Sequence, residues 1–570
     1  MSRAIPCHFV TLTASQLDER RATLDRHGFY AWLSPVVLLG IVFAIRFAGA
    51  FYEDRIVPLS KDSPGQPPST LQVQQRRISW WLDQPITSEF GTIKVHILGV
   101  AYACWLLFLT LRQTGDDYLY LTKLLGHVAV SQLPFQYMMA IKSPRNPVQF
   151  ATGLSHETLN PYHRLFGRII HLFLAAHAVL YMNFFVMEKI LSQRLRNLDV
   201  CLGLTAFTIF TVLAITALPP VRRTAYHKHF YRPHVVLSGL LMPAIFMHVP
   251  TARKYVYQMA ACYIFNGAAR SNSTSVPITS TLSLICGTNL AKLRIPGPAW
   301  GVPPLLGAGT PGWVPGQHVY VKRSISPAMP RSPLTVVSLP PRESQDGGDE
   351  SSNIDLVLRV MNGPITSWLA AQPMETGLVA QNARLFVEGP YGQARTYVPT
   401  LLRASESDGA IMLVAGGVGA TFTVPIYLSL LATRKSTQKI YFTWFVKSLR
   451  DAEWGLDMLL TTTVSELNAA VYITKPSNEK LRETVTTKCG LRVLGYGRPP
   501  EMKAVVDDVF LPTGGALEKS PIAKNSVAKV SVLACGPPSM TRALRKEVGK
   551  HVIRDGRHVW YHEETFGLGP

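Results

Sequence analysis

Long apolar runs occupy the first half of the chain and predict helices that cross a membrane. Five runs contain no Asp, Glu, Lys or Arg, and each is close to the ~20 residues that a helix needs to span a bilayer. Two weaker runs flank them, because Trp32–Phe51 contains Arg46 and Tyr255–Ala269 is short. We therefore expect seven spans, with six as the conservative alternative. The uncharged runs are Val95–Leu111, Leu124–Ile141, Ile169–Met187, Val200–Val221 and Pro233–Ala252.

The pattern changes at about residue 270, where short strand-like runs replace the long apolar ones. Gln317–Lys322 and Ile354–Val360 are β-branched runs separated by turn-forming clusters, which predicts a small antiparallel barrel. Further on, the strand-like Ala410–Ala415 precedes a glycine-rich turn and the helix-like Val424–Ala432, which predicts an α/β domain. The expected organisation is a polar segment at 1–30, a helical membrane domain at 31–270, a barrel at 275–395 and a nucleotide-binding domain at 408–570, with Pro341–Asn353 and Pro512–Lys529 as inserted loops.

Two pairs of histidines share one spacing inside the apolar runs. His163 and His177 are 177 − 163 = 14 residues apart. His234 and His248 have the same separation, 248 − 234 = 14. Fourteen helical residues advance about 21 Å and return to within roughly 40° of the starting direction, so each pair lies on one helix face. Polar groups in hydrocarbon are costly and usually functional, so the two helices predict two bis-imidazole haem sites and an electron path across the bilayer.

Lys and Arg in the short loops predict the orientation of the membrane domain. Two alternate loops are strongly basic, whereas the loops between them balance Lys and Arg with Asp and Glu. Basic loops usually face the cytoplasm, which puts His163 and His234 at an inner haem and His177 and His248 at an outer haem. The basic residues are Lys142, Arg145, Arg164 and Arg168 in one loop and Arg222, Arg223, Lys228 and Arg232 in the other.

Composition narrows the range of partners. The net charge is +21 and the isoelectric point is near 9.7, but no aromatic-interleaved basic module occurs, so we expect no nucleic acid partner. Anionic lipid, haem propionates and nucleotide phosphates are sufficient targets for the charge. The seven cysteines form no CxxC pair or metal cluster in the sequence. The N-terminal sequence has no secretory signal pattern, so the first span is expected to direct insertion.

A glycine-rich turn predicts where a dinucleotide binds. It joins the strand at 410–415 to a helix N-terminus, where glycines permit close approach of backbone N–H groups to a pyrophosphate. A second strand, Val530–Ala534, runs into a Cys-Gly-Pro sequence and supports the prediction. The candidate residues are Gly416, Gly417, Gly419 and Thr421 in the turn and Cys535, Gly536 and Pro537 after the second strand.

Two cations are candidates for recognising a phosphorylated ribose. Lys447 and Arg450 follow the predicted strand Lys439–Val446, where a ribose 2′-phosphate would lie. This placement favours NADPH over NADH. Two solvated surface cations are an equally good interpretation.

From the first span to the C-terminus, the chain resembles the fungal ferric reductases of the ferric reductase and NADPH oxidase superfamily. The segment 157–164 with His177 resembles the family's first haem helix, and the basic pair at 222–223 with His234 and His248 resembles the second. The tail is similar to a ferredoxin-reductase-like flavin barrel followed by a nicotinamide domain. The resemblance is carried there by Pro315–Val321, by the closing turn Gly389, Pro390, Tyr391 and Gly392, and by the nucleotide-side motifs at 416–421 and 535–537.

Two departures from the family concern the flavin. The family's flavin motif reads His-Pro-Phe-Thr, and the matching positions here are Ser332, Pro333, Leu334 and Thr335, so the histidine and the aromatic contact are lost. The usual terminal aromatic pair is also absent, which leaves Phe566 to cover the isoalloxazine ring. The resemblance implies FAD, two b-type haems and NADPH as cofactors, with Phe566 and Cys535 where the hydride is transferred.

Three functions follow from the resemblance. The first is a metalloreductase that passes NADPH electrons to extracytosolic ferric or cupric ions or their chelates. The second is an oxidase that reduces dioxygen to superoxide, and the third is a haem membrane protein with a degenerate flavin site. Short outer loops such as Pro250–Lys254 leave little protein to enclose an oxygen pocket, which favours metal. The resemblance also implies a plasma-membrane location, with the vacuolar membrane as an alternative, a cytosolic dehydrogenase tail, and a downstream iron permease or oxidase.

Overall fold

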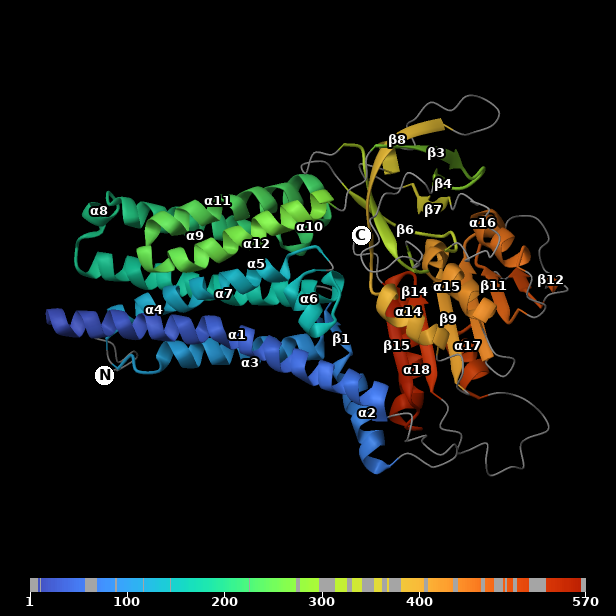
Figure 1. The fold of residues 1–570 in the computed structure, drawn as a ribbon, viewed down its shortest axis with the longest axis horizontal. Coiled ribbons are helices and arrows are strands. Elements are labelled where there is room, and N and C mark those ends of the chain that lie inside the picture. The colour runs from blue at the N-terminus through green and yellow to red at the C-terminus, as the bar shows by residue number, and fades with distance from the viewer. Residues whose placement is uncertain are drawn as a thin grey trace. The chain divides into compact units, whose positions relative to one another are not determined.

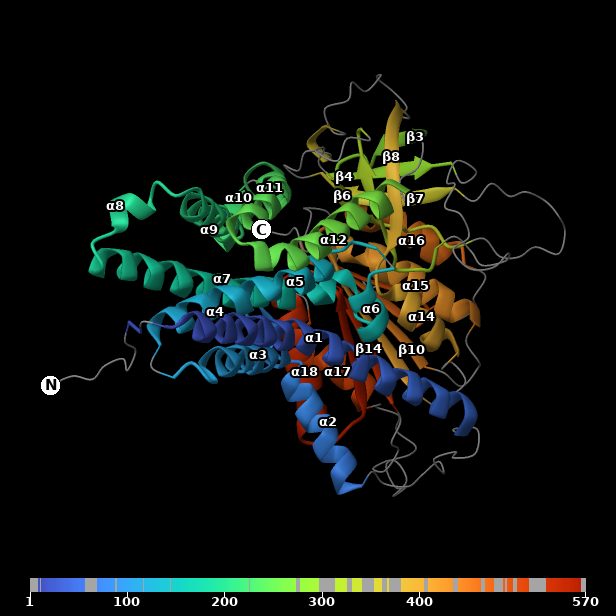
Figure 2. The ribbon, with the colours of Figure 1, turned by 60° about the vertical axis from the view of Figure 1, so that its left-hand side comes forward.

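The computed structural model divides into two compact units, drawn as ribbons in Figures 1 and 2. One contains residues 1–60 and 82–272, and the other contains residues 61–81 and 273–569. The structure describes the chain apart from residues 1–8, 11, 57–68, 88–89, 116, 144, 225, 273–276, 297–312, 325–330, 341–352, 361–365, 369–380, 404–408, 434–438, 463–466, 476–484, 487–489, 496–499, 512–528 and 565–570.

The first unit is helical, apart from a short hairpin of β1 (Pro85–Thr87) and β2 (Gly91–Thr92). Among the described residues, five helices are long and apolar enough to cross a membrane, and they coincide with five of the seven predicted runs. The other two runs fall on α4 with α5 and on α12. The helices are α1 (Ala14–Ile56), α3 (Ile93–Leu111), α4 (Tyr118–Ser131), α5 (Leu133–Met139), α6 (Pro147–Thr152), α7 (His156–Met187), α8 (Leu191–Arg194), α9 (Leu198–Thr216), α10 (Pro219–Thr224), η1 (Tyr226–Tyr231), α11 (Arg232–His248), η2 (Pro250–Ala252) and α12 (Arg253–Asn272).

One predicted run is interrupted. The helix at 118–131 stops at Gln132, and a new helix begins with Pro134 in its first turn. Proline lacks a backbone N–H and its ring conflicts with the carbonyl four residues earlier, so it favours the start of a helix over the interior. The run Leu124–Ile141 is therefore two helices in series. At the other end of the pair, Asp117 caps α4 by accepting a hydrogen bond from the Tyr120 N–H at 3.0 Å.

Large apolar side chains are exposed around the first unit. Val100 on α3, Leu172 on α7 and Ile264 on α12 are 64 %, 67 % and 69 % exposed. A protein surrounded by water rarely exposes so many large apolar groups on adjacent helices, whereas helices in lipid do. Buried residues such as Leu106, Leu124 and Ile170 instead hold the helices together.

After residue 273, the second unit contains a six-stranded antiparallel barrel sheet in the order β6-β5-β8-β3-β4-β7. Alternate residues of each strand face inward, as Val319, Val321 and Leu356 do, so the barrel has an apolar interior. The helix α14 follows the last barrel strand. The elements are β3 (Ile278–Leu284), β4 (Leu290–Ile295), β5 (His318–Lys322), β6 (Ser332–Thr335), β7 (Ile354–Arg359), β8 (Gln381–Tyr391) and α14 (Ala394–Arg403).

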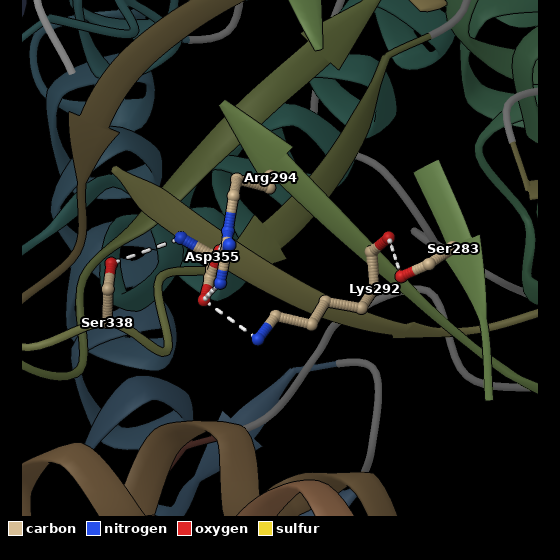
Figure 3. A network of polar contacts seen from close by, with 5 residues as sticks. All are labelled: Ser283, Lys292, Arg294, Ser338 and Asp355. Carbon is tan, nitrogen blue, oxygen red and sulfur yellow. Dashed lines mark hydrogen bonds and ion pairs between the residues drawn. The ribbon is translucent and has the colours of Figure 1, made fainter. Parts of the chain in front are cut away.

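A network of polar contacts on the outer surface of the barrel links β4 to β7 (Figure 3). Arg294 donates to both carboxylate oxygens of Asp355, from Nε at 2.8 Å and from Nη2 at 3.1 Å. Lys292 Nζ lies 2.9 Å from Asp355 Oδ2, and the Asp355 N–H donates to Ser338 Oγ at 3.2 Å. Burial of Asp355 opposes ionisation, but the two cations outweigh it and lower the pKa of the carboxyl.

The chain ends in an α/β domain whose seven-stranded sheet has the order β12-β13-β11-β10-β9-β14-β15. All pairings are parallel except that of β12 with β13. Chain order reverses between β9 and β14, and such a switch point is where open α/β sheets bind ligands. The elements are β9 (Ala410–Gly416), η5 (Gly417–Gly419), α15 (Ala420–Thr433), β10 (Lys439–Val446), α16 (Leu449–Leu460), β11 (Ala469–Ile473), β12 (Val485–Thr486), β13 (Arg492–Gly495), α17 (Met502–Phe510), β14 (Val530–Cys535), α18 (Pro538–Ile553) and β15 (Val559–Glu564).

The predicted fold class, a helical membrane domain followed by a barrel and an α/β domain, is confirmed. One difference lies near the N-terminus, where the polar segment at 1–30 is already helical from Ala14. Another concerns the helix α2 (Thr70–Leu82), most of which is grouped with the second unit although it lies between two membrane helices in sequence. The predicted loops Pro341–Asn353 and Pro512–Lys529 fall almost wholly outside the described residues.

Candidate functional site

The inner pair of predicted haem ligands lies close together, with one residue on each of two helices. His163 on α7 and His234 on α11 have ring centroids 6.4 Å apart, with the ring planes inclined by 65°. Two imidazoles that share one metal through bonds of about 2 Å, with half a ring on each side, have centroids about 6 Å apart. The geometry of this pair therefore fits one iron held from both axial directions.

Backbone carbonyls of neighbouring segments orient three of the four predicted ligands. The Nδ1 atoms of His177 and His248 lie 2.7 Å from the carbonyl oxygens of Thr122 and Asp199, respectively. His163 Nδ1 lies 3.2 Å from the carbonyl oxygen of Gln136. Because a carbonyl only accepts, each Nδ1 carries the proton, which leaves the Nε2 lone pair for a metal.

The fourth ligand differs from the others. His234 Nδ1 is buried and has no hydrogen-bond partner among the described residues. Its ring packs against Phe230, with centroids 5.0 Å apart. Packing, and not a hydrogen bond, therefore sets the orientation of this ring.

Glycines on the supporting helices make room for the outer imidazoles. A Cβ at Gly126 on α4 would lie 2.6 Å from His177 Nδ1, and a Cβ at Gly203 on α9 would lie 2.5 Å from His248 Cε1. Any side chain at these positions would displace the ring that rests there. The same arrangement supports the inner pair, because a Cβ at Gly167 would lie 2.8 Å from the Gln136 side chain, whose amide donates to the His163 carbonyl oxygen.

Three other histidines of the membrane helices have structural partners. His171 Nε2 lies 3.0 Å from Thr211 Oγ1, and its ring stacks on Phe207. His96 Nδ1 lies 2.9 Å from the carbonyl oxygen of Thr92, and His127 Nε2 lies 3.4 Å from Asp25 Oδ1. These contacts explain why the 14-residue spacing, and not histidine content, identifies the ligand candidates.

The two predicted flavin motifs lie on either side of one strand. β5 pairs with β6 on one edge and with β8 on the other, so His318 stands opposite both Thr335 and Tyr391. Its neighbour two residues on, Tyr320, stands opposite Pro333 and Glu388. We call this set the polar barrel face, made of His318, Tyr320, Lys322, Pro333, Thr335, Glu388 and Tyr391.

A buried ionic cluster lies at one end of the polar barrel face. The carboxylate of Glu388 has no exposed surface, and its Oε2 lies 2.9 Å from Arg331 Nη1 and 3.1 Å from Lys322 Nζ. Tyr391 OH donates to Glu388 Oε1 at 3.1 Å. Glu388 thus connects the strand before the Gly-Pro-Tyr-Gly turn to the residue before Ser332, which fixes the two motifs relative to each other.

The altered motif residues divide between two environments. Leu334 stands opposite Val319 and is buried among the apolar residues of the barrel interior. Ser332 stands opposite Val321 and is partly buried, whereas Pro333 and Thr335 belong to the polar barrel face. Sequence reasoning named all four residues but missed His318 and Tyr320. The strand alternation of residues 317–322 was the signal that would have found them.

The two predicted nucleotide motifs touch each other at the switch point of the sheet. A Cβ at Gly419 would lie 2.2 Å from the Cys535 carbonyl oxygen, and a Cβ at Gly416 would lie 2.5 Å from Pro537 Cδ. A Cβ at Gly536 would in turn lie 2.9 Å from the Gly416 backbone. The glycines therefore permit the close approach of two backbone segments. Gly417 has φ +55°, a conformation that favours glycine, and leads into the N-terminus of α15 with Thr421 in its first turn.

Two residues beside the glycine turn were missed by sequence reasoning. Trp444 on β10 donates its indole N–H to the Gly417 carbonyl oxygen at 2.9 Å. Arg359, at the end of β7, is close enough that a Cβ at Gly417 would lie 3.2 Å from its Nη2. A guanidinium beside a glycine-rich turn and a helix N-terminus adds a positive group where phosphate would lie.

Of the two residues predicted at the hydride-transfer site, the structure describes only Cys535. Cys535 ends β14 and is 1 % exposed. Burial, with the carboxylates of Glu564 and Glu563 nearby, raises the pKa of its thiol well above the usual value, so the thiol is neutral at physiological pH. Phe566 lies outside the described residues.

The two cations predicted to read the ribose lie after β10 as expected, and both are exposed. Lys447 directly follows the strand. The Arg450 guanidinium is folded toward the β3–β4 turn, since a Cβ at Gly287 would lie 2.3 Å from its Nη1. The structure therefore keeps Lys447 at the strand end and directs Arg450 toward the barrel.

Comparison with known proteins gives matches in both units. Residues 125–245 match the family of ferric reductase like transmembrane components, and residues 409–549 match the ferric reductase NAD binding domain. The chain is 25 % identical over 345 residues to the probable cell surface ferric reductase kap2 of Aspergillus oryzae, covering 58 % of this chain and 44 % of that protein. It is 23 % identical over 410 residues to the probable metalloreductase AIM14 of Scheffersomyces stipitis, covering 70 % and 68 %.

A third relative is an oxidase. Dual oxidase 2 of Sus scrofa is 26 % identical over 262 residues, which cover 41 % of this chain and 15 % of that protein. The chain thus spans less than half the length of two of these three relatives. The chain thus combines helices long and apolar enough to cross a membrane, in a region that matches ferric reductase like transmembrane components, with a region that matches the ferric reductase NAD binding domain.

Proposed function

We propose that the chain is a transmembrane metalloreductase. It takes hydride from cytosolic NADPH and passes single electrons through FAD and two b-type haems to ferric or cupric ions outside the cytosol. The observation that carries this proposal is the pairing of His163 with His234 at 6.4 Å, together with carbonyl-anchored imidazoles at His177 and His248. On each of two membrane helices, two histidines lie 14 residues apart, and no role without electron transfer requires that arrangement.

The division of labour follows from what each group can carry. Nicotinamide gives two electrons as hydride and haem iron accepts one at a time, so a flavin is needed between them. The protein contributes position. His163 and His234 would hold the inner haem and His177 and His248 the outer haem. For His163, His177 and His248 the hydrogen bond of Nδ1 to a carbonyl leaves Nε2 for the iron, whereas packing against Phe230 orients His234.

The polar barrel face is the proposed seat of the flavin. Thr335 offers a hydroxyl, Tyr391 and Tyr320 offer aromatic surface, and the turn at Gly389–Gly392 lets the backbone approach. Ser332 and Leu334, the other two motif positions, flank the face without belonging to it. His318, between the two motifs, is an added candidate because its imidazole is buried in the row that links Thr335 to Tyr391.

The switch point between β9 and β14 is the proposed site of NADPH. Gly416, Gly417, Gly419 and Thr421 would cradle its pyrophosphate, with Arg359 as an added cation. Gly536 and Pro537 would border the nicotinamide, and the neutral Cys535 thiol would contribute its bulk to the pocket without acting as a nucleophile. Lys447 would contact the ribose 2′-phosphate, and Arg450 would lie close by.

Localisation and partners complete the proposal. The basic residues between 142 and 168 and between 222 and 232 support a cytosolic position for the dehydrogenase half. The name of the Aspergillus relative supports the plasma membrane, and metal reduced there would be taken up by an iron permease, alone or with an oxidase. The bilayer and the extracytosolic metal or its chelate are the direct partners.

The similarity to dual oxidase 2 supports one alternative function, an oxidase, because the same electron path can end on dioxygen. The deciding experiment uses the purified full chain in proteoliposomes with NADPH outside, in orientation-sorted vesicles. A ferric chelate and oxygen compete as acceptors, and ferrous iron and superoxide are measured separately. We expect ferrous iron as the main product. Superoxide as the main product would favour the oxidase.

Two variants sharpen this experiment. His177→Ala should remove the outer haem and stop metal reduction, whereas the matched His171→Ala should keep both haems because His171 binds Thr211. A parent that is inactive at saturating FAD, and regains activity in Ser332→His, would favour a degenerate flavin site. One haem per chain by pyridine haemochrome would contradict the two-haem path.

A further inference from the structure

The helix α2 lies between the first two membrane helices in sequence but is packed against the nucleotide-binding domain. Its residues 70–81 belong to the second unit. Trp80 is the point of attachment, since its indole is 6 % exposed and is part of an apolar cluster with Leu544 and Val548 of α18. An aromatic side chain that buries this much surface is a strong anchor.

The contacts around Trp80 are specific. Its ring meets that of Tyr561 on β15 edge-on, with centroids 5.7 Å apart. The Arg545 guanidinium of α18 lies 4.7 Å from the centroid of the indole and 4.9 Å from that of Tyr561. The tryptophan is therefore held by apolar packing, by an aromatic edge and by a cation at the same time.

Two glycines of the nucleotide-binding domain shape the surface that receives α2. A Cβ at Gly549 would lie 2.8 Å from Trp80 Nε1, and a Cβ at Gly556 would lie 3.1 Å from Val73 Cγ1. The Gly556 carbonyl oxygen accepts a hydrogen bond from Arg76 Nη1 at 2.9 Å. Val73, Arg76 and Trp80 recur at helical spacing, so one face of α2 fits this surface along its length.

The position of α2 in the chain gives this contact a consequence. Only residues 83–92 separate Leu82 from the start of α3 at Ile93, and Asp83 and Lys94 form an ion pair across that link. The second unit is thus connected to the membrane helices through the chain after α12, which leads into the barrel, and through α2, which packs against the nucleotide-binding domain. Fewer orientations of the domain are allowed than with one connection.

We propose that Trp80 is a positioning residue, which anchors α2 to the nucleotide-binding domain and thereby sets the rate of electron delivery from NADPH to the inner haem. The inference rests on the proposed function, since it concerns the rate of that electron transfer. The inference also agrees with the expected topology. If the chain has seven spans, it crosses the membrane six times between α2 and the residues after α12. An even number returns the chain to the same side, in agreement with α2 packing against the domain that follows.

The test compares neighbouring tryptophans in the full-length protein. Trp80→Ala should lower the rate of haem reduction by NADPH about tenfold, while the KM for NADPH stays within about twofold. Trp81 is 51 % exposed on the same helix, and Trp81→Ala should leave the rate unchanged. Trp80→Phe should restore most of it. Equal losses in the two alanine variants, or no loss in Trp80→Ala, would overturn the proposal.

A second variant tests the same contact from the side of the nucleotide-binding domain. Gly549→Ala places a methyl group against the indole, although alanine by itself favours a helix. We expect it to slow haem reduction in the parent and to have no further effect in Trp80→Ala, because the methyl group then has space. Additive losses would contradict the proposal.

Amide hydrogen exchange of α2 separates the docking from the proposed function. Protection of α2 in the parent, lost in Trp80→Ala and kept in Trp81→Ala, would establish the contact even if the protein reduced no metal. An unprotected α2 in the parent would overturn the docking whatever the activity.

Discussion

The proposed haem ligands and the polar barrel face differ in what holds their side chains in place. Each outer imidazole projects from one helix and is oriented by a carbonyl and a glycine of a neighbouring helix, at Thr122 and Gly126 for His177. The barrel face is assembled from three strands, and the buried Glu388 ties them together through charged side chains. Backbone groups therefore position the haem ligands, whereas side chains position the proposed flavin site.

This difference has a consequence for substitution. A carbonyl persists whichever side chain its residue carries, so the haem sites depend on few residue identities: the histidines and the glycines beneath them. The barrel face depends on the strand register and on several polar side chains at once. The following experiments test whether the two regions respond to substitution as this difference predicts, in order of decreasing effect.

The largest effect is expected from the ligands themselves. His248→Ala should remove the outer haem, halve the pyridine haemochrome signal and reduce metal reduction to background, because the electron path then ends at the inner haem. The inner haem should stay in place and remain reducible by NADPH. Retention of two haems in His248→Ala would show that another residue is the ligand.

Substitution of the glycines that contact the histidine rings should have the second-largest effect. Gly126→Ala places a Cβ 2.6 Å from His177 Nδ1 and should weaken outer haem binding or activity by about tenfold to a hundredfold, as loss of a ligand's orientation does. Gly267→Ala on α12 is the control, since nothing lies within 4 Å of its Cβ. Haem content and rate unchanged in Gly126→Ala would mean that the carbonyl alone positions the ring.

A moderate effect is expected in the barrel. Leu334→Phe restores the family's aromatic residue, but its side chain enters the filled barrel interior, so we expect a loss of about 1–3 kcal/mol in stability by overpacking. Ser332→His, the companion change, starts from a partly buried position at the end of the strand, so it should destabilise the barrel less than Leu334→Phe. Thermal unfolding and FAD titration of the two variants measure the difference. Tighter FAD binding by Leu334→Phe at unchanged stability would show that the position faces the flavin.

The smallest effect is expected from the ion network of Figure 3. Asp355→Asn should cost about 1 kcal/mol or less in the free energy of unfolding, because Arg294 is half exposed and solvent screens the pair. The folded-state pKa of Asp355 lies below the ordinary 3.8, so its contribution is present above that pH and is lost as the pH falls through the folded pKa. Denaturant unfolding of both proteins between pH 7 and 3 should show the difference shrinking toward acid. A difference that grows there would reverse the sign.

The contrast also explains what the sequence alone could predict. Helical periodicity links residues 14 apart without any knowledge of the neighbours, so the histidine pairs were found from spacing. The predicted strand Lys439–Val446 has the observed bounds, and the predicted run Ile354–Val360 ends one residue after the observed strand, because apolar runs end at turn residues. By contrast, strand alternation could show which face of its strand His318 occupies, but its place between the two flavin motifs needs the pairing of β5 with both β6 and β8.

Other differences have equally physical causes. The break between α4 and α5 follows from Pro134. The membrane runs were predicted from the absence of charged residues, and that criterion does not detect a proline. The docking of Trp80 depends on Gly549, more than four hundred residues away, and on the absence of a side chain there. Contacts of this kind are set by tertiary shape, and a tryptophan in a polar helix gives no sign of the surface that it meets.

The carbonyls that orient His177 and His248 have one more property. Each belongs to a helix, at Thr122 in α4 and at Asp199 in the first turn of α9, and a carbonyl oxygen has two lone pairs. One can accept the helix hydrogen bond while the other accepts the imidazole proton, so neither helix has to open to receive a ligand. A chain inserting its helices one after another thus creates both acceptors as soon as α4 and α9 are formed, before either histidine packs against them.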